Sequence, residues 1–241
     1  MRKVMATRRV QRELLKIDGR SVEVTMRLNP RARRLIVKVH PSTGEVTVVA
    51  PSRRGLDRAL DFARGEAPWI ARQLARVPKP IPLVPGAHIP FLGREHAIVK
   101  MARGTVVRNA DAATIAVGGA DAHAQRRVVD FLKREARRIC DERSHDFAAR
   151  IDAKVKRVTV RDTASRWGSC STSQSISYSW RLIFAPPFVL DYVVAHEVAH
   201  LREMNHGPRF WRLVRSIIPD IETPQAWLRK NGTALHRYGA V

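Results

Sequence analysis

Hydrophobic and polar residues alternate in short runs over the first 50 positions of the chain. A period of two is typical of strands with one buried face, and it predicts strands over residues 21–28, 34–40 and 45–50. From residue 56 to residue 76 the apolar positions follow helical spacing, which Pro68 interrupts. We therefore predict a β-rich module followed by a helix that breaks or restarts at Pro68.

Four prolines lie between residues 78 and 85, and they predict a stiff linker and a domain boundary. Beyond it, glycines punctuate short apolar runs over residues 86–119, which indicates further strands. The remaining pattern predicts a helix over 122–150, strands near 155–162 and 175–184, and helices over 189–203, 208–217 and 223–230. No internal repeat is evident.

This order of elements predicts an α+β fold. We place a basic β-rich module with a helix at residues 1–80. A second region follows at residues 86–241, with its core at 122–232.

The strongest chemical signal is the HExxH motif at residues 196–200. Residues four apart lie on the same face of a helix, so His196 and His200 can present two imidazoles to one ion. Glu197 is adjacent to the first ligand, close enough to act on a water molecule at that ion. The neighbouring residues are mostly apolar, so we expect this helix to be buried.

A third histidine, His206, follows ten residues after His196. Asn205, Gly207 and Pro208 favour a turn after the helix, which would bring His206 back to the ion. Three imidazoles and one open position are typical of catalytic zinc, whereas structural zinc has four protein ligands. The alternatives are core histidines beside an incidental glutamate, a non-catalytic metal site, or another metal that imidazole binds.

Several motifs around these histidines resemble the YgjP-like metallopeptidases, a family related to the SprT-like zinc peptidases. They are Arg166-Trp-Gly-Ser-Cys170, Ile176-Ser-Tyr-Ser-Trp-Arg-Leu182, Leu190 through His200, Asn205-His206 and Phe210-Trp211. The resemblance extends more weakly to the N-terminal part, through Trp69-Ile70 and Phe91-Leu-Gly-Arg94.

The resemblance implies a minimal zincin-like metallopeptidase domain, in which an antiparallel sheet lies beside the HExxH helix. It implies one Zn²⁺ per chain, held by His196, His200 and His206. Glu197 would be the catalytic base, taking a proton from the metal-bound water and passing it to the leaving amine.

The reaction also needs a second donor for the oxyanion, and the sequence leaves it open. Arg166 and Tyr192 are candidates for this donor or for substrate binding. His236 and Tyr238, which we expect in a C-terminal tail, are further candidates. We expect the strand near residues 175–180 to offer its edge to an extended peptide.

The chain of 241 residues carries 44 Lys and Arg against 22 Asp and Glu, a formal net charge of +22. Residues 1–80 hold 19 basic and 7 acidic side chains, so the excess is greatest there. This charge suggests DNA or another polyanion as a partner, in addition to a peptide or protein substrate. The alternative is a general abundance of arginine that specifies no site.

Two further functions therefore remain open from the sequence. One is a basic nucleic-acid-associated protein whose metal site acts on DNA-bound or crosslinked proteins. The other is a metal-dependent hydrolase of a non-peptide amide.

Two cysteines, Cys140 and Cys170, form no CxxC pair and predict reduced thiols. No apolar run is long enough to span a membrane, and the basic N-terminus lacks the apolar run of a signal peptide. We therefore expect a cytoplasmic protein with no membrane partner.

Overall fold

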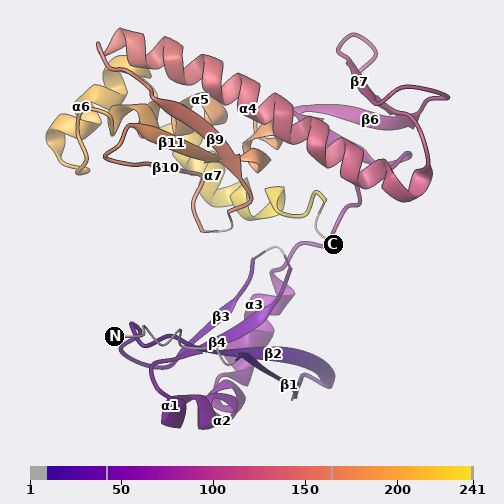
Figure 1. Ribbon diagram of the computed structural model, residues 1–241, viewed down its shortest axis with the longest axis vertical. Helices are drawn as coiled ribbons and strands as arrows, with labels where there is room; N and C mark the ends of the chain where they lie inside the picture. The colour runs from indigo at the N-terminus through magenta and orange to yellow at the C-terminus, as the bar shows by residue number, and fades with distance from the viewer. Residues whose placement is uncertain (1–9, 42, 164, 240–241) are drawn as a thin grey trace, which may run out of the picture. The chain divides into compact units, whose positions relative to one another are not determined.

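The computed structural model describes residues 10–41, 43–163 and 165–239, which form two compact units, Met1–Pro78 and Lys79–Val241. Helices and strands are mixed in both units, which confirms the α+β prediction (Figure 1). No helix in the described ranges is long and apolar enough to cross a membrane.

The first unit is a four-stranded sheet with three short helices. Its strands are β1 (Val10–Ile17), β2 (Arg20–Leu28), β3 (Ile36–Val39) and β4 (Val46–Ala50), in the order β1-β2-β4-β3. The helices are α1 (Arg53–Asp57), α2 (Ala59–Gly65) and α3 (Ala67–Ala75). Strand β1 was not predicted. The helix expected over 56–76 is three helices, and Pro68 lies in the first turn of the last one.

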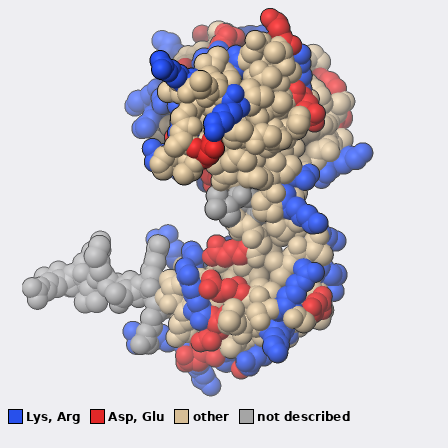
Figure 2. Space-filling model, turned by 90° about the vertical axis from the view of Figure 1, so that its right-hand side faces the viewer, with Lys and Arg blue, Asp and Glu red and all other residues tan. Residues whose placement is uncertain are grey.

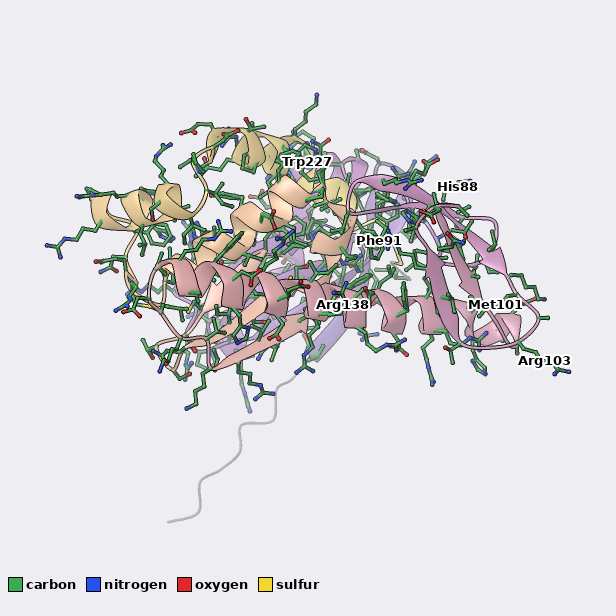
Figure 3. All side chains as sticks on the ribbon, turned by 90° about the horizontal axis from the view of Figure 1, so that it is seen from above. His88, Phe91, Met101, Arg103, Arg138 and Trp227 are labelled. Atoms are coloured by element: carbon green, nitrogen blue, oxygen red, sulfur yellow. The ribbon has the colours of Figure 1, made fainter. Side chains whose placement is uncertain are left out.

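The second unit begins with another four-stranded sheet. Its strands are β5 (His88–Phe91), β6 (Arg94–Lys100), β7 (Val106–Asn109) and β8 (Thr114–Val117), in the order β5-β6-β8-β7. A 27-residue helix, α4 (Ala124–Arg150), follows and packs against the rest of this unit (Figure 1). Its exposed face carries ion pairs, such as those of Arg138 with Glu135 and Glu142 (Figure 3).

The two four-stranded sheets have the same topology. In each, an antiparallel hairpin is followed by a parallel pairing and then by a second antiparallel pairing. The first hairpin of each sheet turns through two residues with positive φ, Asp18-Gly19 in one and Leu92-Gly93 in the other. The two sheets therefore repeat one topology, although no repeat is evident in the sequence.

A three-stranded sheet, β9 (Arg157–Arg161), β10 (Gly168–Cys170) and β11 (Ser175–Ser179), lies beside the helices of the second unit. Its order is β10-β11-β9, and β11 is antiparallel to β10 but parallel to β9. The sheet is therefore mixed rather than wholly antiparallel. Residues 180–184 form a 3₁₀ helix, which corrects the strand expected up to residue 184.

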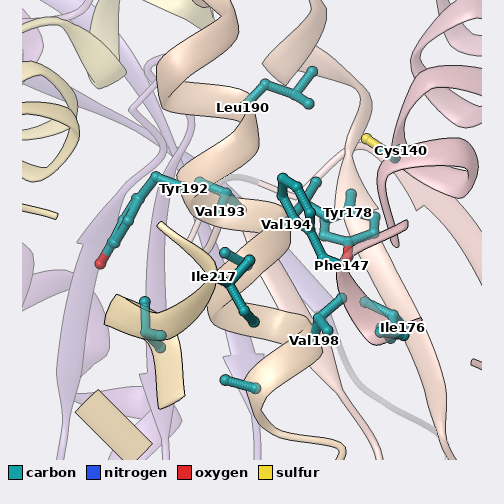
Figure 4. Close-up of a cluster of buried hydrophobic side chains, with 14 of the residues drawn as sticks. Cys140, Phe147, Ile176, Tyr178, Leu190, Tyr192, Val193, Val194, Val198 and Ile217 are labelled. Carbon is teal, nitrogen blue, oxygen red and sulfur yellow. The ribbon is translucent and has the colours of Figure 1, made fainter. Parts of the chain in front are cut away.

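Three helices complete the second unit: α5 (Pro187–Ala199), α6 (Pro208–Ile217) and α7 (Glu222–Leu235). Helix α5 is buried on most sides, because α4, α6, α7 and β10 all pack against it. The main cluster of buried side chains lies between α4, α5, α6 and the three-stranded sheet (Figure 4). Within it, the hydroxyl groups of Ser144 and Tyr178 are hydrogen-bonded at 2.9 Å.

The proline-rich segment belongs in part to the second unit rather than forming a free linker. The side chain of Leu83 is fully buried, and the backbone N–H of Ile81 donates to the carbonyl oxygen of Arg237 at 2.8 Å. Ile81 also forms a parallel β-bridge with Tyr238. The segment from Ile81 onward is thus tied to the last described residues.

The described residues after α7 are held against the rest of the second unit, which corrects the expectation of a C-terminal tail. Arg181, which is 4% exposed, donates to both carboxylate oxygens of Asp162 at 2.8 and 3.1 Å. The same guanidinium donates to the carbonyl oxygens of His236 and Tyr238, at 3.2 and 2.6 Å. Arg181 therefore joins β9, the 3₁₀ helix and the C-terminal segment.

Candidate active site and metal centre

Helix α5 positions two of the three predicted metal ligands. Pro186 and Pro187 begin the helix, and the tip of the β5–β6 hairpin packs against its start, where a Cβ on Gly93 would lie 3.0 Å from Pro186 Cα. The helix ends at Ala199 rather than at residue 203, so His200 occupies its C-cap. His196 and His200 remain one turn apart, and their ring centroids are 5.1 Å from each other.

The chain turns back after His200 and brings His206 to the same place. Pro208 begins α6, as the sequence indicated. The Nε2 atoms of His206 and His196 lie 3.0 Å apart, and one ring nitrogen from each of the three histidines lies within 4.8 Å of the others. Phe210 packs against all three rings, at centroid distances of 4.6 to 4.9 Å.

The histidines could hold a metal ion, and His200 fits one in its hydrogen bonding as well as its position. His200 Nδ1 donates to the Glu203 carbonyl oxygen at 3.0 Å, which leaves its Nε2 as the nitrogen with a free lone pair. Burial, together with the neighbouring His200 and His206, lowers the pKa of His196 to about 4. His196 is therefore neutral at pH 7, the form in which imidazole binds a metal.

Glu197 is buried beside these histidines, with 6% of its surface exposed. Burial raises its pKa to about 7, against the opposing effects of the Arg166 guanidinium and a hydrogen bond from the backbone N–H of Cys170. A carboxyl group with this pKa can both accept and release a proton near neutral pH.

Gly168 in β10 makes room for Glu197, and sequence reasoning missed this role. A Cβ at position 168 would lie 2.5 Å from Glu197 Cγ and 2.6 Å from its Oε1. No residue other than glycine fits there unless Glu197 moves. The glycine of the Arg166-Trp-Gly motif was the feature of the sequence that could have indicated this close approach.

A pocket of about 360 Å³ opens beside Glu197 and His196. Both candidate donors, Arg166 and Tyr192, line it. The Tyr192 ring lies on the side of α5 away from Ile176 and Tyr178 (Figure 4). Helix α7 also lines the pocket, with three residues that the sequence did not indicate: Gln225, Leu228 and Arg229.

His236 and Tyr238 do not line this pocket. The His236 ring stacks on Trp167 at a centroid distance of 5.3 Å, and Trp167 does line it. Tyr238 packs instead against Phe184 at 4.7 Å. His236 thus supports the pocket wall, and neither residue is placed to serve as the second oxyanion donor.

The expected edge strand is also corrected. Strand β11 pairs on both sides, so it has no free edge, whereas β10 is at the edge of the sheet and contains Gly168. Both cysteines are free thiols, as predicted. Burial and the charge of Glu197 raise the pKa of Cys170 to about 11. Among the described residues, the group that could hold a metal ion consists of the three histidines and does not include Cys170.

Comparison with known proteins places this chain in a family of metallopeptidases. The model of the YgjP-like family, metallopeptidase domain, matches residues 33–231. The chain therefore belongs to the YgjP-like metallopeptidase family, as its motifs predicted. Membership supports peptidase function in general, with a metal ion as cofactor and a protein or peptide as substrate.

Among solved structures, the chain is similar to the crystal structure of the metallopeptidase zymogen of Pyrococcus abyssi abylysin. The two share 19% sequence identity and a TM-score of 0.36, over 41% of this chain and 97% of that chain. A search of curated proteins found no match.

Proposed function

We propose that the chain is a zinc-dependent metallopeptidase that hydrolyses peptide bonds, and that residues 86–241 are its catalytic region, with residues 1–80 as a separate module. The observation that carries this proposal is the convergence of three imidazoles within 4.8 Å beside a buried glutamate. His196, His200 and His206 would hold the ion, and Glu197 would act as the base.

When bound, zinc supplies a Lewis acid that polarises a carbonyl group and makes a water molecule more acidic. Glu197 accepts a proton from the attacking water at its carboxylate and delivers it to the nitrogen of the leaving amine. The Tyr192 hydroxyl and the Arg166 guanidinium are the candidates for stabilising the oxyanion, since both line the pocket beside Glu197.

An extended substrate has a docking place at strand β10. This strand is at the sheet edge, and Gly168 within it touches Glu197. A peptide that adds to this edge would form main-chain hydrogen bonds, which hold it regardless of sequence. The scissile bond would then lie beside the Glu197 carboxylate.

Glu197→Gln tests the proposal. The amide cannot take a proton, so cleavage of casein should fall by about 100-fold or more while one zinc per chain is retained. Glu142→Gln, which removes an exposed carboxyl group on α4, is the matched control and should leave both quantities unchanged. Zinc content by mass spectrometry and cleavage by gel densitometry provide the measurements. Cleavage by Glu197→Gln at the wild-type rate, or by metal-free protein, would refute the mechanism.

The alternative of a non-peptide amide as substrate has no specific observation in its favour. The comparisons do not support DNA binding either. On the face shown in Figure 2, Lys and Arg side chains are spread over both units and Asp and Glu side chains lie among them. In the first unit, Arg27 is paired with Glu45, and Arg64 with Asp61. A role for DNA therefore stays a prediction from charge alone.

A further inference from the structure

The pocket beside Glu197 has a distinctive chemical composition. Its walls are partly apolar, formed by Trp167, Val193 and Leu228. Two arginines, Arg166 and Arg229, also line it, and among the described residues Glu197 is the only acidic one that does. The pocket therefore has more positive than negative charge even before a cation binds to the histidines.

Helix α7 holds one side of this pocket in a defined position. Gln225, Leu228 and Arg229 have the spacing i, i+3, i+4, which places them on one face of the helix. One turn further along this face is Gly232, where a Cβ would lie 3.1 Å from Trp167 Cζ2. The absence of a side chain at Gly232 lets Trp167 pack against α7, so the aromatic wall and Arg229 are held together.

Hydrogen-bond donors gather at the polar end of the pocket. The Tyr192 hydroxyl accepts a hydrogen bond from Gln225 Nε2 at 2.8 Å, which leaves its own proton free to donate. Burial raises the pKa of Tyr192, and the charge of Glu197 adds to this effect, whereas the hydrogen bond from Gln225 and the positive charge of Arg229 oppose it. Tyr192 and Arg229 both line the pocket. The Tyr192 hydroxyl and Arg229 therefore face the same space.

Apart from Glu197, the described residues that line this space include no carboxylate that could neutralise the donors. Some of the other described arginines pair with a carboxylate, as Arg215 does with Glu222 at 2.7 Å. In contrast, neither Arg229 nor Arg166 has a carboxylate oxygen within 4.0 Å in the described part of the chain. A guanidinium and a free hydroxyl proton that converge without an anion form a suitable binding site for a carboxylate.

We propose that this pocket binds a carboxylate of the substrate through Arg229 and Tyr192, so that cleavage is favoured beside an acidic residue. This inference rests on the proposed peptidase function and names its substrate class. The carboxylate can come from an Asp or Glu side chain or from the free C-terminus of a peptide. A Lys or Arg side chain is disfavoured, because it would meet Arg166 and Arg229.

The first experiment determines the preference and the source of the carboxylate. A proteome-derived peptide library is digested with the full zinc-loaded chain, and mass spectrometry identifies the residues on both sides of each cut. We expect Asp and Glu to be enriched at one position next to the scissile bond. Matched peptides with Glu, Gln or Lys there, each with an amidated or a free C-terminus, then separate a side-chain carboxylate from a terminal one.

Changing the charge at Arg229 tests whether this residue is responsible. The wild type should cleave the Glu peptide about five to ten times faster than the Gln peptide, as measured by kcat/KM. Arg229→Gln should reduce this ratio to about two or less, and Arg229→Glu should make the Lys peptide the better substrate. Lys230→Gln removes the next cation on the same helix, which does not line the pocket, and should leave the ratio unchanged.

A binding measurement separates this inference from the proposed function. Fluorescence anisotropy with the zinc-loaded Glu197→Gln chain compares the dissociation constants of labelled Glu and Gln peptides without requiring cleavage. Tighter binding of the Glu peptide that is lost in the double variant with Arg229→Gln supports the inference even if no cleavage is found. Equal binding of both peptides, or an unchanged preference in Arg229→Glu, overturns it even if the chain is an active peptidase.

Discussion

Replacing Gly168 by alanine should damage catalysis without removing the metal. The new Cβ would lie 2.5 Å from Glu197 Cγ, whereas ordinary van der Waals contact begins at 3.4 Å. The glutamate or strand β10 must therefore move by the difference, about 0.9 Å. Because Glu197 is buried and enclosed, the displacement shifts its carboxylate relative to the histidines. A misplacement of this size can cost about 100-fold in rate.

The assay compares kcat/KM on a peptide substrate with zinc content and melting temperature. We expect Gly168→Ala to lose about 100-fold in kcat/KM while still binding one zinc. Gly65→Ala is the control, because nothing lies within 4 Å of a Cβ at that position. Wild-type kcat/KM in Gly168→Ala would show that the close approach of β10 to Glu197 does not position the base.

Three further predictions concern stability and charge. Arg181→Met leaves the half-exposed Asp162 carboxylate and two carbonyl oxygens without their donor. The free energy of unfolding in urea should therefore fall by about 3 kcal/mol. An unchanged urea midpoint would contradict this prediction. Burial raises the pKa of Asp162, but the hydrogen bonds and charge of Arg181 outweigh this effect and lower it. The stabilisation by this ion pair is therefore present above the unfolded-state pKa of Asp162 and is lost as the pH falls through its folded-state pKa. In metal-free protein, burial raises the pKa of Glu197 from 4.5 to about 7. The free energy of unfolding of the wild type, relative to that of Glu197→Gln, should therefore decrease as the pH rises from about 4.5 to about 7. A difference in unfolding free energy that stays constant over this range in urea titrations would refute this prediction. If the basic module binds DNA, the affinity should fall steeply with salt and weaken when Arg31, Arg33 and Arg34 are replaced by glutamine, whereas salt-independent affinity would reject the polyanion hypothesis.

The cluster of three histidines could be predicted because it depends on local geometry. Residues four apart on a helix share a face, and the glycine and proline after His206 favour the turn that returns it to the first two histidines. The length of the helix was less predictable. His200 lies at the C-cap, because the chain leaves the helix at Ala199, yet the relation between the two histidines is unaffected.

The rest of the site depends on contacts between segments that are distant in sequence. Nothing local to Gly168 shows that a glutamate 29 positions later will approach it, and nothing local to Arg229 shows that α7 will line the pocket. Residues 180–184 were expected as a strand, because a short buried apolar run has no diagnostic period. Strand β1 was missed because only Leu15 and Ile17 are buried in it, so its alternation is weak.

The bridge between Ile81 and Tyr238 has a consequence for protein engineering. It places the segment at Ile81, near the start of the second unit, beside the last described residues of that unit. The backbone N–H of Gly239 adds a hydrogen bond to the Ile81 carbonyl oxygen at 2.9 Å. We expect a unit closed in this way to tolerate circular permutation, since a short peptide can join its two ends while new termini are opened in an exposed loop. The loop after β6, which includes the exposed Arg103, is a suitable place for the new termini (Figure 3). The same closure allows the unit to be inserted into a host protein as a cassette.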